Sequence, residues 1–446
     1  MTEARNPLYT TETQKQIGEL SRLGWYHSIE LPDGQIIPGL QTVDQLRHRL
    51  AQFPIPRDLT GKRVLDIGAW DGWFSFEMEK RGAKVLALDY AEQTRFKVAR
   101  DLLGSHVDYQ IGDITRISPR DIGRFDIVLF FGVLYHVKHP VLALETVCDL
   151  STDMAFIESY VSDDGTNLEA PPVMEFYETT ELRGQFDNWV GPNTSCLLAF
   201  CRTAGFARVQ FESVIDHRAH VTCFRKWGRP PACPGGVAAY ITCVENSVSR
   251  DHQFSSRTDD YVAIWFKSPE SDLTPDDVFP EIGPFGSRPV HVHHTGGDGW
   301  HANCKLPPGL DPGWYATRLR VRDSAYSNEV RIGIDVPPPT PEPHPAGGLR
   351  IRLVTDGRTW DRYQVHTGTD ACVSLWVEGL PDPGEPRDVR VRLNGTDLPA
   401  IYVSSRDREG ASQVNALLPA GLTPGRATIE LVFADSVSQP VELQLV

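Results

Sequence analysis

Short apolar runs alternate with helical stretches between residues 61 and 160. The runs that read as strands are KRVLDIG, KVLALDY, FDIVLFFG and MAFIESY, and the stretches that read as helices include FSFEMEKRGA and PVLALETVCDL. Strands separated by helices of this length predict right-handed βαβ units and a mainly parallel sheet that is covered on both faces. The pattern resumes in a helix ending at Gly205 and in the strands RVQFESVI and YVAIWFK, so we expect this domain to span residues 61–268.

Two segments of this region lack a regular period. Residues 1–60 read as a helical or lid segment, and residues 162–193 are rich in Pro, Asn, Asp and aromatic side chains, as expected of a lid or substrate wall. The insertion either lines an acceptor pocket or packs as a small core of its own, through the aromatic residues Phe176, Tyr177, Phe186 and Trp189.

The sequence beyond residue 270 is rich in segments with strand-like alternation and contains an internal repeat. NCKLPPGLDPG from Asn303 matches NALLPAGLTPG from Asn415, a spacing of 415 − 303 = 112 residues. A proline-rich spacer at 337–348 separates the two copies. We therefore expect two small all-β sandwiches, at 270–336 and 349–446, which look like immunoglobulin-like modules.

Composition narrows the class of partner. The chain has 446 residues with 44 Lys and Arg against 59 Asp and Glu, and its net charge of −15 disfavours an extended nucleic-acid partner. We find no apolar stretch long enough for a membrane span, and the eight cysteines form no C-x-x-C motif. A soluble, cytoplasmic protein with reduced thiols is expected.

The turn after the first strand carries candidate chemistry. It reads D-x-G-x-x-x-G, with Asp66, Gly68 and Gly72, whereas a dinucleotide site would favour G-x-G-x-x-G. This turn suits a ligand with a methionine-like ammonium and a ribose. Asp89 ends the next strand, where a carboxylate can accept both ribose hydroxyls, and Asp113 follows the third strand, within reach of an adenine amino group. Each signal alone also fits turn or cap chemistry, but three at successive strand ends favour a cofactor site.

These residues resemble the class I S-adenosylmethionine-dependent methyltransferases, which have a Rossmann-like fold. The stretch GVLYHVKHP at 132–140, the pair Glu158-Ser159 and the stretch NWVGPNTSCLLAFCRTAGF look more narrowly like the tRNA wobble-uridine carboxymethyltransferases and their relatives. The resemblance implies S-adenosylmethionine as cofactor. The expected cofactor residues are Asp66, Gly68, Ala69, Trp70, Gly72, Asp89, Tyr90, Asp113, Ile114, Phe131, Tyr135 and Trp25.

The N-terminal segment departs from the tRNA enzymes. Those enzymes carry a lysine that reads the carboxylate of carboxy-S-adenosylmethionine, whereas WYHSIELPDGQIIPG at 25–39 contains none. Ordinary S-adenosylmethionine is therefore the expected cofactor. The sequence of this N-terminal segment and of the glycine turn resembles that of relatives that methylate small molecules, including sugar acids and secondary metabolites.

Three residues are candidates for catalysis. Methyl transfer to a hydroxyl is helped by a base within hydrogen-bond reach, and His136, at the end of the fourth strand, is the first candidate. Glu158 ends the following strand and could act as a base or orient a histidine, and His27 lies in an aromatic segment that could close over the cofactor. Each of these side chains also fits a purely structural role.

A histidine cluster in the first β region consists of His291, His293 and His294, with His301 further on. Strand alternation places His291 and His293 on one face, but no third ligand follows at a convincing spacing, so a surface strand is favoured. We expect no metal ligands, although a divalent ion at the active site stays an open alternative.

The function expected from the sequence is O-methylation of a small polar metabolite, a sugar or natural product. One alternative is a tRNA wobble-uridine modifying enzyme; another is a non-catalytic glycan- or protein-binding chain on a relic methyltransferase fold. The expected partners are a small-molecule acceptor and a second copy of the chain joined through the β modules, with no nucleic acid and no membrane.

Overall fold

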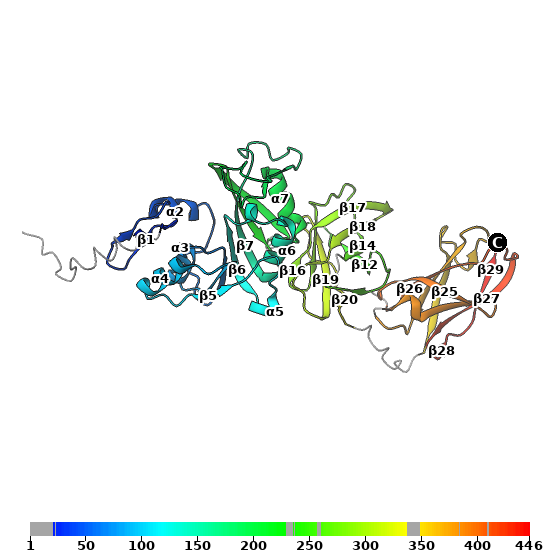
Figure 1. Cartoon of the computed structure of the whole chain (residues 1–446). Helices are drawn as coiled ribbons and strands as arrows, with labels where there is room; N and C mark the ends of the chain where they lie inside the picture. Colours follow the sequence, from blue (N-terminus) through cyan, green and yellow to red (C-terminus); the bar gives the residue numbers. More distant parts are fainter. Residues whose placement is uncertain are drawn as a thin grey trace, which may run out of the picture. The chain divides into compact units, whose positions relative to one another are not determined.

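A computed structural model describes residues 21–22, 24–228, 235, 237–256, 260–336, 348–382, 384–407 and 410–446. The chain divides into two compact units, Met1–Trp227 and Gly228–Val446 (Figure 1). Most of the proline-rich spacer expected at 337–348, together with residues 1–20 of the expected lid segment, lies outside the described residues.

The first unit is built on a seven-stranded, mainly parallel sheet with strand order β10-β11-β7-β6-β3-β4-β5. The parallel strands are β3 (Arg63–Ile67), β4 (Lys84–Asp89), β5 (Asp108–Ile111), β6 (Phe125–Phe131) and β7 (Ser151–Tyr160). Two antiparallel strands, β11 (Arg218–Phe224) and β10 (Arg208–Ile215), complete one edge. The predicted Rossmann-like sheet is confirmed.

Helices cover both faces of this sheet, because successive strand residues point to opposite sides. In β3, Val64 joins one core cluster, while Leu65 and Ile67 join the other. The first cluster contains residues of α2 (Val43–Leu50), α3 (Trp73–Lys80) and α4 (Thr94–Leu103). The second contains residues of α6 (Pro140–Leu150) and α7 (Thr194–Thr203). Figure 1 shows these two helical layers on opposite sides of the sheet.

The segment before the sheet folds as a small hairpin followed by a helix. Strand β1 (Ile29–Glu30) pairs with β2 (Ile36–Ile37), and α2 begins after Thr42, whose side chain and that of Gln45 cap the helix reciprocally. Short elements connect the main strands: α5 (Pro119–Ile122), the 3₁₀ helix η1 (Leu134–His136), and a two-stranded sheet of β8 (Met174–Phe176) and β9 (Val190–Pro192) inside the 162–193 insertion.

The strand YVAIWFK was placed wrongly by the sequence. It forms β14 (Tyr261–Lys267) in a four-stranded sheet of the second unit, with β12 (Tyr240–Asn246), β18 (Gly299–Lys305) and β17 (Pro289–Gly296). The parallel sheet therefore ends in β10 and β11, and the second unit begins at Gly228, well before the expected boundary at 268. A continuous apolar run fits any buried strand, so its pattern does not reveal which sheet it joins.

The 112-residue repeat corresponds to two copies of one arrangement of strands. The first copy adds a second sheet made of β13 (Gln253–Phe254), β20 (Val330–Ile334), β19 (Gly313–Val321), β15 (Val278–Ile282) and β16 (Phe285–Gly286). The strands of the second copy are β21 (Arg350–Asp356), β22 (Gln364–Val365), β23 (Cys372–Glu378), β24 (Val389–Leu393), β25 (Thr396–Val403), β26 (Ser412–Leu417), β27 (Gly425–Phe433), β28 (Ser436–Val437) and β29 (Val441–Leu445), with the 3₁₀ turn η2 (Pro386–Asp388). Strands β19 and β27 have the same length and start 425 − 313 = 112 residues apart. The first copy thus begins near β12, at residue 240, rather than at the expected 270.

Candidate active site

The turn between β3 and α3 requires its two glycines for conformational reasons. Gly68 has φ +72° and Gly72 has φ +90°, in the left-handed region that favours glycine. A Cβ on Gly68 would collide with Val133, and one on Gly72 would lie 2.7 Å from the rings of Phe76 and Phe96. The glycines therefore let the turn pass close to the end of β6 and to α4.

Asp89 joins the end of β4 to this turn. Its Oδ2 accepts a hydrogen bond from the Trp70 amide at 2.9 Å, and its Oδ1 accepts one from the Tyr90 amide at 3.0 Å. Burial raises the pKa of the Asp89 carboxyl, although these amides partly oppose that shift. The Tyr90 side chain is exposed, Trp70 is more than one-third exposed, and Ala69 is buried.

Asp66 is turned toward helix α3. It is buried, its Oδ2 accepts a hydrogen bond from Ser75 Oγ at 2.6 Å, and burial raises its pKa to about 7. Asp113 follows β5, where its half-exposed carboxylate accepts from the amide and hydroxyl of Thr115 at 2.9 and 2.8 Å, and Ile114 beside it is buried. The Gly112 amide donates to the Asp89 carbonyl at 2.8 Å, so the ends of β4 and β5 are adjacent.

Sequence reasoning missed Asp71, the fourth position of the same turn. This fully buried carboxylate accepts from the Tyr26 and His27 amides at 2.7 and 2.9 Å and pairs with Arg95 Nε at 2.9 Å. Asp71 therefore attaches the N-terminal segment to the turn, and Trp25 of that segment is buried. The sequence shows an acid inside a glycine-rich turn, which could have marked Asp71 as a candidate. It does not show that the N-terminal segment and Arg95 lie next to this acid.

Glu158, near the end of β7, is held between two guanidinium groups. Its Oε1 accepts from Arg218 Nη1 of β11 at 2.8 Å, and its Oε2 pairs with Arg49 of α2. Burial alone would raise the pKa of Glu158, but the charges of Arg49 and Arg218 outweigh it and lower the pKa to about 2. Such a carboxylate stays ionised at neutral pH and accepts protons poorly. Neither arginine was a sequence candidate.

His27 lies beside this cluster. It is buried, and burial followed by the charge of Arg49 lowers its pKa to about 3, so the ring is neutral. Its ring packs edge-on against Phe74 at 5.6 Å, and its Nδ1 has no hydrogen-bond partner among the described residues. Phe74 in turn packs against Phe131 at 5.0 Å, so His27 belongs to an aromatic wall formed at the end of β6 and the start of α3.

His136 is the last residue of the 3₁₀ helix η1, which follows β6. Its Nδ1 lies 2.9 Å from the Asp187 carbonyl oxygen. A carbonyl only accepts, so we assign the proton to Nδ1, which leaves Nε2 with a free lone pair. The ring packs on Tyr135 at 4.3 Å, and about one-third of the side chain is exposed. Tyr135 is buried, which raises its pKa, and lies beneath the guanidinium of Arg218 at 5.3 Å.

Some aromatic side chains of the insertion are packed against neighbouring residues, and others are exposed. The Trp189 amide donates to the Tyr135 carbonyl at 2.8 Å, and Lys138 lies over the Trp189 ring at 4.1 Å. Tyr177 is buried and donates to Glu175 at 2.6 Å. Phe176 and Phe186 are largely exposed. The insertion therefore packs on η1 beside His136 and also presents an apolar surface.

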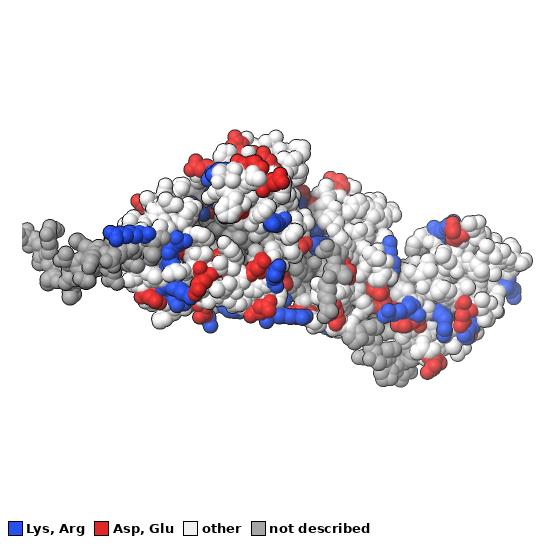
Figure 2. Space-filling view, viewed as in Figure 1, with Lys and Arg blue, Asp and Glu red and all other residues white. Residues whose placement is uncertain are grey.

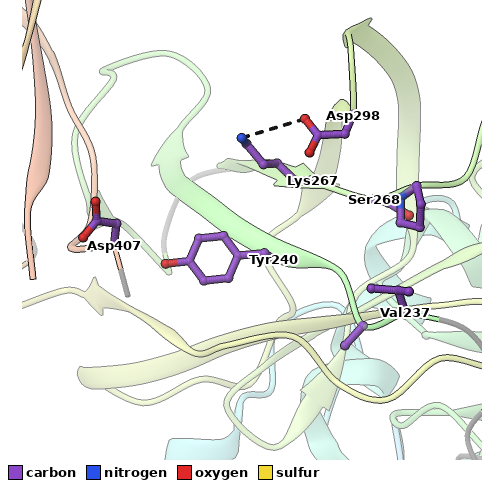
Figure 3. Close-up of a pocket in the computed structure, with 8 residues that line it drawn as sticks. Val237, Tyr240, Lys267, Ser268, Asp298 and Asp407 are labelled. Carbon is purple, nitrogen blue, oxygen red and sulfur yellow. Dashed lines mark ion pairs between the residues drawn. The ribbon is translucent and has the colours of Figure 1, made fainter. Parts of the chain in front are cut away.

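Four wider observations concern metal ligands, membrane spans, surface charge and cavities. Among the described residues, no group of three or more His, Cys, Asp or Glu side chains is arranged to hold a metal ion, and no helix is long and apolar enough to cross a membrane. Figure 2 shows Lys and Arg interspersed with Asp and Glu on the face in view. The second unit contains an open hollow of about 530 Å³ beside the Lys267–Asp298 ion pair, with Val237 and Tyr240 in its wall (Figure 3).

Comparison with known proteins identifies an enzyme domain in the first unit. Residues 40–195 match the protein-family model described as a methyltransferase domain. This range includes the glycine turn, Asp89, Asp113, His136 and Glu158. The chain therefore carries a methyltransferase domain, which covers well under half of its length.

Two curated relatives and one solved structure are similar to parts of the chain. A ubiquinone biosynthesis O-methyltransferase of Idiomarina loihiensis is 36% identical over 112 residues, 24% of this chain and 45% of that protein. A tRNA U34 carboxymethyltransferase of Pseudomonas paraeruginosa is 28% identical over 178 residues, 36% of this chain and 52% of that protein. The chain thus spans about half the length of these relatives. The N-terminal domain of EvdMO1, solved in the presence of SAH and D-fucose, is 22% identical with a TM-score of 0.36, covering 49% of this chain and 98% of that one.

Proposed function

We propose that this protein is an S-adenosylmethionine-dependent methyltransferase that methylates a hydroxyl of a small polar metabolite, a sugar or a natural product. The observation that carries the proposal is the methyltransferase domain at 40–195, which contains the turn held by Asp89. The O-methyltransferase among the relatives supports the choice of oxygen as acceptor.

The cofactor would lie along the ends of β3, β4 and β5. Asp89 accepts from two backbone amides and from the Gln93 side chain, which leaves a lone pair of the carboxylate for a ribose hydroxyl. Asp113 and Ile114 would flank the adenine, and the turn from Gly68 to Gly72 would face the methionine part. The proposed wall near the reacting carbon is formed by Trp25, Phe131 and Tyr135.

His136 is the proposed general base. Bound S-adenosylmethionine would supply its methyl group to the acceptor oxygen and leave as a thioether, and the hydroxyl proton would pass to the base. The Nε2 of His136 has the lone pair for this step because Nδ1 is bonded to the Asp187 carbonyl. Most of the remaining acceleration would come from aligning the acceptor with the methyl group.

Glu158 and His27 take positioning roles in this proposal. Glu158 holds Arg49 of α2 against Arg218 of β11 and so fixes the N-terminal helix beside the ends of β6 and β7. His27 is neutral and joins the aromatic wall that excludes water.

Calorimetric titration with S-adenosylmethionine and S-adenosylhomocysteine tests the cofactor. We expect micromolar binding by the wild type, with Asp89→Ala weakening it at least tenfold. Asp108→Ala is the matched control, because this aspartate starts β5 and lies at the opposite end of a strand from the site. Absence of binding to either ligand would reject the proposal and favour the non-catalytic alternative.

A second candidate is carboxymethyl transfer to tRNA, favoured by the carboxymethyltransferase relative. Both functions would use the same turn, so the assay compares S-adenosylmethionine with carboxy-S-adenosylmethionine. Turnover of small hydroxylated acceptors with the first supports O-methylation. Modification of tRNA that requires the second would instead support the tRNA function.

The proposal also assigns a role to the two β modules. We propose that they are immunoglobulin-like, that they restrict access of the acceptor or join two copies of the chain, and that the protein works in the cytoplasm. Sedimentation of the full chain tests self-association, and a monomer at all concentrations would reject that role.

A further inference from the structure

The first β module places three histidines together on one face of a sheet, in a region that the proposed methyl transfer does not use. Strands β17 and β18 are antiparallel, and His293 lies directly opposite His301. His291 lies two residues before His293 on the same strand, so its side chain points to the same face. Strand pairing thus brings His301, which the sequence analysis named, beside the two histidines of β17, a position that spacing along the chain does not show.

One distance between these rings fits two nitrogens that share a metal ion. Nδ1 of His293 and Nδ1 of His301 lie 3.4 Å apart. A tetrahedral zinc ion with bonds of about 2.0–2.1 Å to nitrogen would hold two ligand nitrogens about 3.3–3.4 Å apart. The ring centroids of His291 and His293 are 5.0 Å apart, and those of His293 and His301 are 4.8 Å apart.

The third ligand is not yet in place. The described residues contain no ready-made group of three that could hold an ion. His291 and His293 are exposed, however, so rotation of their side chains between ordinary rotamers is unobstructed by a packed core. The site would therefore assemble when the ion arrives.

His301 is buried and presents its Nδ1 to His293. It is 7% exposed and packs against Trp265 at 4.4 Å. Arg250 lies nearby, but its charge is paired with Glu245 at 2.7 Å.

The second copy of the module shows that the fold does not require these histidines. His301 corresponds to Gln413, 112 residues later. Tyr402 pairs with Asn415 as His291 pairs with Asn303, so Tyr402 is the counterpart of His291. Ser404, two residues further, is the counterpart of His293. A module with Tyr, Ser and Gln at these positions forms the same arrangement of strands.

We propose that His291, His293 and His301 bind a divalent transition-metal ion of the zinc type. Imidazole suits zinc, copper and nickel, whereas magnesium and calcium prefer oxygen ligands. Three protein nitrogens would leave a fourth coordination position open on the exposed face of the sheet, for water or a ligand atom. This inference is independent of the proposed methyl transfer.

Titration of the full chain with zinc chloride in a non-chelating buffer tests the site. The wild type should bind one ion, and His293→Ser and His301→Gln, two variants that carry the residues of the second copy, should bind it more weakly. We expect each to weaken binding at least tenfold, since even the loss of groups that only orient metal ligands costs roughly 10–100-fold. His291→Ala, at an exposed position, tests the third ligand.

His294→Ala is the matched control. It lies on the same strand but packs on Trp300 at 4.9 Å, and its Nε2 contacts the Gly297 carbonyl oxygen at 3.0 Å. This variant should bind zinc as the wild type does. Absence of saturable binding by the wild type, unchanged binding by H293S and H301Q, or equal loss in H294A would each overturn the proposal. The visible spectrum of bound cobalt gives a second readout, with a tetrahedral band that H301Q should abolish.

Discussion

Replacing Glu158 by glutamine tests the link between the N-terminal helix and the sheet. The wild-type carboxylate accepts from Arg218 through one oxygen and pairs with Arg49 through the other. Glutamine has the same shape but no charge. Its NH₂ group is a hydrogen-bond donor and would face one of the two guanidinium groups, which are also donors. Two partly buried cations would remain without their shared anion.

The depressed pKa of Glu158 gives the size of the expected loss in folding free energy. It falls from 4.5 to about 2, and each unit corresponds to about 1.4 kcal/mol, so the ionised form contributes about 3 kcal/mol to folding at neutral pH. Removal of one partner of a buried ion pair costs about 3–5 kcal/mol in general. Because the folded-state pKa is depressed, this contribution is complete above pH 4.5 and is lost as pH falls toward 2.

Hydrogen exchange measured on peptides of β7 and β11 reports the first unit separately from the second. After correction for intrinsic rates, E158Q should lower the opening free energy by about 3 kcal/mol at pH 7 and by much less at pH 2.5. Glu77→Gln, which removes a surface pair with Lys80, should change it by about 0–1 kcal/mol. A loss below about 1 kcal/mol for E158Q, or the same loss at both pH values, would refute the reasoning.

Three further changes test the turn and the proposed base. Gly68→Ala should destabilise the protein by more than the roughly 1–2 kcal/mol of left-handed strain seen with Gly61→Ala, because only Gly68 faces a neighbour, Val133; equal changes in melting temperature would contradict this. Asp71→Ala leaves two amides unpaired and should speed hydrogen exchange in residues 24–31 and weaken S-adenosylhomocysteine binding, and unchanged exchange would reject the attachment. His136→Gln should lower kcat about 10²–10⁴-fold while the affinity for S-adenosylhomocysteine stays constant; a change confined to cofactor affinity would exclude the base role.

The candidate site was only partly foreseeable. The turn and Asp89 stand out in the sequence because each follows a strand at a regular interval, and the structure joins them by the hydrogen bond from the Trp70 amide. Glu158 also stood out as an acid after a strand, but its chemistry depends on Arg49, 109 residues earlier, and Arg218, 60 residues later. No spacing rule connects residues that far apart. The sequence therefore suggested Glu158 as a proton acceptor, whereas in the structure it is an ionised carboxylate that holds two arginines.

The sequence by itself determined the parallel sheet, the glycine turn and the duplication of the β module, because strand length, turn chemistry and a 112-residue repeat are local or periodic patterns. Tertiary structure alone decided that 261–267 joins the first module, that Asp71 attaches the N-terminal segment, and that His301 lies opposite His293. Each of these depends on which distant segments meet. Many pairings bury the same apolar area, and hydrogen bonds and charges between distant residues select one of them without leaving a periodic signal in the chain.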